Sequence, residues 1–178
     1  MKKKMNHSLS LLLVVVVCIT KITGYPWLDS SKDPSERAKE LVKEMTLDEK
    51  ISMVHGEPTK YTGRTPAIDR LKIPAIEMQD GPNGVARMND TTGWPGAQTL
   101  VASWDKELAL KYYKAQGLEF RGKGSNVALG PMVNLARVPM SGRLFESMGE
   151  DPVLASAFAV AATKGIQSNG VLACVKRK

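Results

Sequence analysis

The feature that most constrains the fold of this chain is an alternation of short apolar segments with capped helical segments along residues 33–175. Two helices are expected to begin at the pairs Asp33-Pro34 and Asp151-Pro152, because Asp is a favoured N-cap and Pro fits the first helical position. Alternation of this kind is typical of parallel β/α units, in which a helix follows each strand and packs on the sheet. The sequence therefore predicts an α/β fold.

The spacing of apolar residues sets the boundaries of the expected elements. Thr46 and Glu49 form a capping box, which predicts a second short helix behind the first. Apolar residues at positions 38, 41, 42 and 45 recur at helical spacing, so one face of the first helix is expected to be buried. Helices are expected at 34–45, 47–54, 105–121 and 152–166, and strands at 73–78, 97–102 (the weakest candidate), 127–129 and 171–175.

The length of the chain limits how large this α/β domain is. A complete (β/α)8 barrel needs about 250 residues. Residues 25–178 provide roughly 150, which is room for about four units, or half a barrel. A doubly wound sheet is the alternative on the pattern alone. The absence of a glycine-rich phosphate-binding fingerprint after any expected strand weakens that alternative.

The N-terminus has the pattern of a secretory signal peptide. A basic segment at 2–4 precedes an apolar segment at 9–19, and Gly24 is the best cleavage position. A membrane anchor is the alternative, but the apolar segment is too short to span a bilayer comfortably. We therefore expect a signal peptide at 1–24, a domain at 25–178 and a secreted, extracellular product without a membrane segment after cleavage.

Two small sequence features bear on that compartment. Cys18 leaves with the signal peptide, so Cys174 is unpaired in the mature chain and a disulfide framework is excluded. The tripeptide Asn89-Asp90-Thr91 matches the pattern of an N-glycosylation acceptor, although such tripeptides are common by chance.

The net charge of +7 does not indicate a nucleic-acid partner. The excess lies at the two ends, in Lys2, Lys3, Lys4 and Lys21 and in Lys176, Arg177 and Lys178, and the body between them is balanced. No basic helical stripe is present of the kind that binds a phosphate backbone. The two histidines are too few and too scattered for a metal site, and the sequence points to no cofactor.

Two positions stand out as candidates for binding chemistry. Asp80 follows Gln79 at the end of the strand expected at 73–78 and precedes a Gly-Pro turn, and functional residues of β/α barrels sit at the carboxyl ends of strands. Arg143 lies in the loop between an expected strand and the helix at 152, with Glu146 three residues on to orient it. Taken alone, a turn aspartate that bonds its own backbone and a surface ion pair explain both positions as well.

Three sequence segments together favour the functional explanation of these two positions. The chain contains QDGPNGVAR at 79–87, NVALGPMVNLAR at 126–137 and SGRLFESMGEDP at 141–152. In this order and spacing they resemble the N-terminal barrel of family 3 glycoside hydrolases, the β-glucosidase-like enzymes. The resemblance extends over nearly all of the chain from Tyr25 to Lys176.

The resemblance implies roles for individual residues. Asp80 would bind hydroxyl groups of the sugar in the −1 subsite, and Arg143 would contact the same sugar. Arg87 is a further candidate, one residue later than in many members of the family. Lys176 matches a sugar-holding lysine, but Arg177 stands where the family has a histidine.

The resemblance also implies a reaction and a limit. The reaction is hydrolysis of terminal non-reducing β-D-glucosyl residues in β-glucosides or oligosaccharides, by double displacement with retention. The family's nucleophile and acid/base residues have no counterpart in this chain, so no catalytic residue is assigned. We expect a truncated, poorly stable and inactive first part of the barrel. The alternatives are an inactive product that binds a sugar or a partner, and a β-xylosidase or arabinosidase of the same family.

Overall fold

A computed structural model describes residues 24–177 and divides them into two compact units. We call residues 24–51 with 68–73 the N-terminal unit, and residues 52–67 with 74–177 the sheet unit. The expected signal peptide at 1–24 lies almost entirely outside the described residues. Between residues 24 and 177, no helix has both the length and the apolar character needed to cross a membrane.

The N-terminal unit is built from short helices. The Asp33 side chain accepts hydrogen bonds from the amides of Ser35 and Glu36, which confirms the predicted start of the first helix. The capping box is also confirmed, because Thr46 N lies 2.8 Å from Glu49 Oε2 and Glu49 N lies 3.2 Å from Thr46 Oγ1. The elements are η1 (Pro26–Leu28), α2 (Pro34–Glu44), the beginning of α3 (Leu47–His55) and η2 (Asp69–Leu71).

The burial predicted for α2 is wrong. No residue of this helix is buried, and Val42 is 50% exposed. Met45, which follows the helix, is buried. The other buried apolar residues of the unit are Trp27, Ile68 and Leu71, and the indole N–H of Trp27 donates to the carbonyl oxygen of Leu71 at 3.0 Å.

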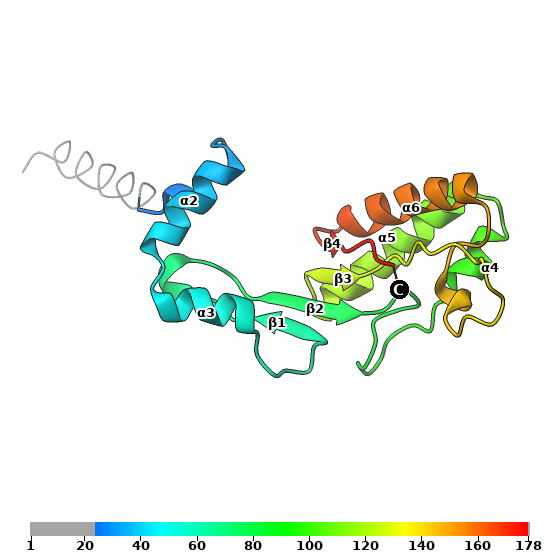
Figure 1. The fold of residues 1–178 in the computed structure, drawn as a ribbon, viewed down its shortest axis with the longest axis horizontal. Helices are drawn as coiled ribbons and strands as arrows, with labels where there is room; N and C mark the ends of the chain where they lie inside the picture. The colour runs from blue at the N-terminus through cyan, green and yellow to red at the C-terminus, as the bar shows by residue number, and fades with distance from the viewer. Residues whose placement is uncertain (1–23, 178) are drawn as a thin grey trace, which may run out of the picture. The chain divides into compact units, whose positions relative to one another are not determined.

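The sheet unit contains a four-stranded mixed sheet in the order β1-β2-β3-β4 (Figure 1). The first pair is antiparallel, and the other two pairs are parallel. Each strand is therefore paired with its neighbour in the chain. The strands are β1 (Gly63–Thr65), β2 (Ile76–Asp80), β3 (Val127–Leu129) and β4 (Leu172–Ala173).

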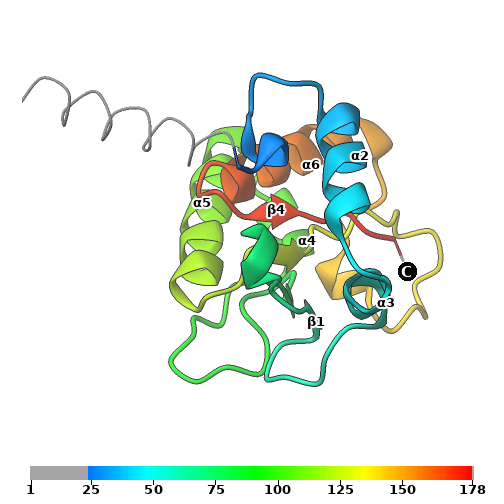
Figure 2. The same cartoon turned by 90° about the vertical axis from the view of Figure 1, so that its left-hand side faces the viewer.

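Helices α5 (Lys106–Gly122) and α6 (Pro152–Gln167) pack against each other and lie beside β3 and β4 (Figures 1 and 2). Their contact is close because Gly165 has no side chain. A Cβ there would lie 2.8 Å from the Cβ of Tyr113. The core under these helices includes Tyr113, Phe120, Phe158 and Ile166, each at most 1% exposed.

Three of the expected strands differ from the structure. The segment predicted as a strand at 97–102 is helix α4 (Ala97–Val101), so that prediction is wrong. The strand expected at 73–78 begins only at Ile76 and continues to Asp80. The strand expected at 171–175 is reduced to β4, followed by an isolated parallel bridge between Met132 and Lys176. Short apolar runs do not distinguish buried helix from strand, which explains the first error.

Other predictions are confirmed in place. Helices α5 and α6 begin behind Asp105 and Asp151, whose side chains accept hydrogen bonds from amides in the first turn. Strand β3 covers the three residues predicted for it. The antiparallel strand β1 was not predicted, because its sequence Gly-Arg-Thr carries no apolar pattern.

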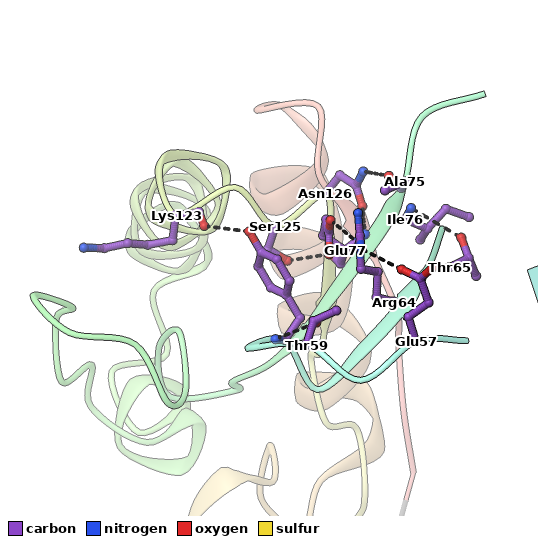
Figure 3. A network of polar contacts seen from close by, with 11 residues as sticks. Glu57, Thr59, Arg64, Thr65, Ala75, Ile76, Glu77, Lys123, Ser125 and Asn126 are labelled. Carbon is purple, nitrogen blue, oxygen red and sulfur yellow. Dashed lines mark hydrogen bonds and ion pairs between the residues drawn. The ribbon is translucent and has the colours of Figure 1, made fainter. Parts of the chain in front are cut away.

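The amino ends of β2 and β3 are joined by a polar network (Figure 3). The Asn126 side chain accepts from the amide of Glu77 and donates to the carbonyl of Ala75, both at 2.8 Å. The buried Ser125 Oγ lies 2.9 Å from the carbonyl oxygen of Glu77. Arg64 of β1 pairs with the Glu77 carboxylate at 2.8 Å. The network fixes the register of these strands at one end, and the candidate site lies at the other.

Candidate functional site

The site begins at a sharp turn behind β2. Asp80 is the last residue of the strand rather than a residue behind it, and the amide of Ala86 returns to its carbonyl oxygen at 2.9 Å. Gly81 (φ 149°) and Gly84 (φ 124°) both lie in a region that other residues rarely adopt. A Cβ on Gly81 would also lie 1.6 Å from the carbonyl oxygen of Gly84. The segment Asp-Gly-Pro-Asn-Gly can therefore make this turn only with both glycines.

Gln79 holds the turn from inside the protein. Its side chain is fully buried, and its amide nitrogen donates to the carbonyl of Ala86 at 2.7 Å. Its amide oxygen accepts from the amide of Thr62 at 2.9 Å and from the hydroxyl of Thr62 at 2.6 Å. The orientation of Asp80 is thus set by its neighbour in the strand, whose side chain lies on the opposite face.

Lys176 meets Asp80 across the parallel strands. The Lys176 Nζ lies 3.0 Å from Asp80 Oδ1, although 96 residues separate the two in the chain. Backbone hydrogen bonds of Lys176 to Pro131 and Val133 extend the parallel pairing beyond β4 and carry the lysine to this position. The Asp80 side chain remains 46% exposed, so one of its oxygens is open to a ligand.

Arg143 and Glu146 form the second ion pair of the site. Arg143 precedes η3 (Leu144–Glu146), and its Nε donates to Glu146 Oε1, as the spacing predicted. The Glu146 side chain is 6% exposed, whereas that of Arg143 is 39% exposed. The hydrogen bond to Glu146 raises the pKa of Arg143, burial opposes this, and the charges of Glu146 and Asp80 raise it further. Arg143 is therefore held as a fixed cation facing solvent.

These groups line one depression of about 440 Å³. Its walls are formed by residues 80–86 behind β2, residues 91–93 of the following loop, and Arg143, Phe145 and Glu146 around η3. The Oδ1 atom of Asn83, which also lines it, is buried and has no hydrogen-bond partner among the described residues. The depression thus presents a half-exposed carboxylate and a guanidinium to solvent.

Helix α5 holds the outer wall of the depression. The two carboxylate oxygens of Glu119 accept from the amide of Thr92 at 2.7 Å and from the indole N–H of Trp94 at 2.8 Å. Tyr112 donates its hydroxyl to the carbonyl of Pro95 at 2.6 Å. Gln116 donates to the carbonyl of Pro82 at 3.1 Å. Positions 112, 116 and 119 lie on one helix face, so a single helix fixes the loop at several points.

The protonation state of Glu119 supports this role. Burial acts to raise its pKa, but hydrogen bonds from Trp94 and Thr92 outweigh that effect and leave the pKa below its usual value. Glu119 therefore stays ionised and keeps both acceptors available to the loop at neutral pH.

Of the four residues proposed to contact a sugar, the structure brings three together and leaves one apart. Asp80 and Lys176 are paired, and Arg143 lines the same depression as Asp80. Arg87 is exposed, has a positive φ of 56° and lines a different hollow, with Lys60 and Lys123.

Sequence reasoning missed the residues that support the site. Gln79, Gln116 and Glu119 were not predicted as part of it. Gln79 and Gln116 are at most 1% exposed. A polar residue at a position expected to be buried is the sequence signal that could have identified them. Gln116 lies at helical spacing from the apolar residues Tyr112, Tyr113 and Phe120, on the buried side of α5. A buried glutamine there needs a hydrogen-bond partner, which the loop carbonyls supply.

The arrangement suits a neutral, hydroxyl-rich ligand. A carboxylate accepts hydrogen bonds from two neighbouring hydroxyls, and a guanidinium donates to hydroxyl oxygens. Both carboxylates of the depression already bind a cation, Asp80 through Lys176 and Glu146 through Arg143. The chemistry of these groups therefore suits a polyol, and they lie at the carboxyl end of the strands, where α/β proteins bind ligands.

An α/β domain with a depression at the carboxyl ends of its strands is the arrangement in which such folds place their ligand sites. The family model described as the glycosyl hydrolase family 3 N terminal domain matches residues 33–177, so the chain belongs to that family. The β-glucosidase BoGH3A of Bacteroides ovatus is 40% identical over 163 residues, which cover 84% of this chain and 21% of that protein. The chain spans about a fifth of the length of the curated relatives it matches.

Solved structures agree with the family. A β-glucosidase from Streptomyces venezuelae, DesR, in complex with D-glucose has a TM-score of 0.74 and 41% identity, covering 80% of this chain and 18% of that one. The β-glucosidase 3B from Thermotoga neapolitana in complex with glucose has a TM-score of 0.70 and 36% identity, covering 78% of this chain and 22% of that one. Both of these structures are complexes with glucose.

Proposed function

We propose that this chain supplies glucose-positioning residues to the hydrolysis of terminal β-D-glucosyl residues. Asp80 would accept hydrogen bonds from two sugar hydroxyls, and Arg143 would donate to the same sugar. Lys176 would hold Asp80 in place and neutralise part of its charge. The observation that carries the proposal is the convergence of Asp80, Lys176 and Arg143, which are distant in sequence, on the carboxyl end of β2.

The relatives support glucose as the sugar. Each protein named above is a β-glucosidase, and two of the structures hold glucose. We also propose that residues 25–178 form the first part of a (β/α)8-type barrel and that the product is secreted through the leader at 1–24.

A second candidate function is sugar binding without turnover by these residues. A retaining glycosidase needs one carboxylate to attack the anomeric carbon and another to donate a proton. In the depression both Asp80 and Glu146 are engaged by cations, which favours positioning over either chemical role. The nucleophile and the acid/base therefore remain unassigned among these residues.

Titration of the purified chain with D-glucose, followed by NMR shifts, tests the proposal. We expect saturable binding that is weakened at least about tenfold in Asp80→Asn, since the substitution removes a charge-assisted acceptor worth about 1.5–3 kcal/mol. Asp90→Asn is the matched control, because Asp90 is an exposed carboxylate in the loop that does not line the depression. Equal affinity in both variants would contradict the assignment of Asp80.

The same preparations separate the two candidate functions. Release of nitrophenol from an aryl β-glucoside, lost in Asp80→Asn, would indicate that the chain turns over substrate. Binding without release would indicate positioning alone. Titration with D-xylose in parallel tests the sugar class, and preference for xylose over glucose would contradict the glucosidase proposal.

A further inference from the structure

We propose that Asn89 carries an N-linked glycan. The tripeptide Asn89-Asp90-Thr91 has the acceptor pattern Asn-X-Thr with a residue other than Pro in the middle. Within residues 24–177 no other asparagine begins such a tripeptide. The proposal goes beyond sugar hydrolysis and rests on the proposed secretion of the chain, because the modification takes place in the secretory compartment.

The structure places the acceptor where a glycan fits. A glycan is bulky and hydrophilic, so its attachment site must lie on the surface. Asn89 is exposed, lies outside any helix or strand, and its side-chain amide has no hydrogen-bond partner among the described residues. Asp90 turns the chain at a φ of 54°, which an aspartate tolerates better than most residues. Attachment there would displace no buried contact.

The fold around Asn89 does not depend on its side chain. The backbone carbonyl of Asn89 accepts from Lys123 Nζ at 2.9 Å, and the loop further on is held by Glu119. Asn89 itself lines a shallow hollow of about 410 Å³ together with Lys60 and Lys123. A glycan on Asn89 would start from this hollow, whereas the depression with Asp80 is lined by Thr91 and does not include Asn89.

The covalent step needs one co-reactant, a lipid-diphosphate-linked oligosaccharide. The Asn89 Nδ2 attacks C1 of its reducing-end sugar, so that an N–C1 bond forms and the bond from C1 to the phosphate oxygen breaks. The lipid diphosphate leaves with the electron pair of that bond. One Nδ2 proton is lost, and no oxidation or reduction occurs. The membrane-bound oligosaccharyltransferase of the secretory compartment catalyses the transfer.

Cell-free translation of the 178-residue chain with microsomes from the endoplasmic reticulum tests the proposal, and it does not require the chain to fold. We expect a single upward shift on a denaturing gel that peptide-N-glycosidase F reverses. Asn89→Gln and Thr91→Ala should abolish the shift. Asn6→Gln should leave it in place, because the tripeptide Asn6-His7-Ser8 lies in the leader. A shift that persists in Asn89→Gln would overturn the proposal.

A positive control distinguishes failure of the acceptor from failure of secretion. Pro139→Asn, made in the Asn89→Gln chain, creates an acceptor tripeptide with Ser141 in an exposed loop. Its modification shows that the chain reaches the lumen. If it is modified and the unsubstituted chain is not, Asn89 is no acceptor. If neither is modified, both the glycan and the secretion on which it rests are wrong.

Discussion

The two ends of strands β2 and β3 are built on opposite principles. At the amino end, Asn126 and the buried Ser125 make short hydrogen bonds to backbone groups of the neighbouring strand. At the carboxyl end, the charged groups Asp80 and Arg143 are 46% and 39% exposed and keep free hydrogen-bonding capacity. At the amino end the polar groups hold the strands together, whereas at the carboxyl end they remain available to a ligand. This is the division known for β/α barrels, with stability at the bottom and function at the top.

The largest expected effect is on the amino end. Asn126→Ala removes the acceptor of the Glu77 amide and the donor to Ala75, and we expect a loss of about 2–4 kcal/mol in the free energy of unfolding. Urea denaturation followed by circular dichroism measures it. Asn89→Ala, at an exposed asparagine, is the control and should change little. A loss under about 0.5 kcal/mol in Asn126→Ala would contradict the view that the polar groups at the amino end stabilise the sheet.

A smaller effect is expected at the outer wall of the depression. Glu119→Ala leaves the amide of Thr92 and the indole of Trp94 without their acceptors, at a cost of about 1 kcal/mol. Glucose affinity should fall as well, because residues 91–93 line the depression. Glu107→Ala, on the same helix but remote from the loop, is the control. An unchanged glucose affinity would show that the loop is ordered by other contacts.

The hydrogen bonds of Glu119 to the loop are expected to depend on pH. The pKa of Glu119 in the folded chain lies below its usual value of 4.5. The contribution of ionised Glu119 to the stability of the fold is therefore complete above pH 4.5, and it is lost as the pH falls through the lower pKa of the folded state. We expect the Trp94 indole proton to lose its hydrogen bond in that acidic range, visible as a shift of its NMR signal. The shift should be absent in Glu119→Ala. A midpoint above pH 4.5 would contradict the sign of the pKa shift.

The smallest expected effect on stability is at the carboxyl end. Lys176→Met breaks the pair with Asp80, but the pair is partly exposed, so we expect a change within about 0.5 kcal/mol. The affinity for glucose should change more than the stability does, because the orientation of Asp80 is altered. Lys164→Met on α6 is a control outside the site. A large loss of stability in Lys176→Met would mean that this end of the sheet is also structural.

The sequence was informative where a residue's role is local. The caps at Asp33 and Asp151, the capping box at Thr46 and the pair of Arg143 with Glu146 all depend on residues within three or four positions of one another. Asp80 was predicted at the end of a strand for the same reason. Such features follow from spacing alone and are confirmed.

The sequence was less informative where a role depends on distant segments. Gln79 joins residue 62 to residue 86, and Glu119 joins α5 to a loop more than twenty residues earlier, so neither has a local pattern. The helix at 97–101 was predicted as a strand because a short apolar run is ambiguous until its neighbours in space are known. The meeting of Lys176 with Asp80 likewise came from the family resemblance and not from spacing.

The order of the strands in the sheet, which is also their order in the chain, has a consequence for biosynthesis. When β3 leaves the ribosome, its partner β2 has already been made, and the same holds for β4 and β3. From β2 onward, each new strand finds one partner that has already been made. The sheet can therefore assemble strand by strand during translation, and Lys176 arrives last, at a carboxylate that the earlier turn has already placed.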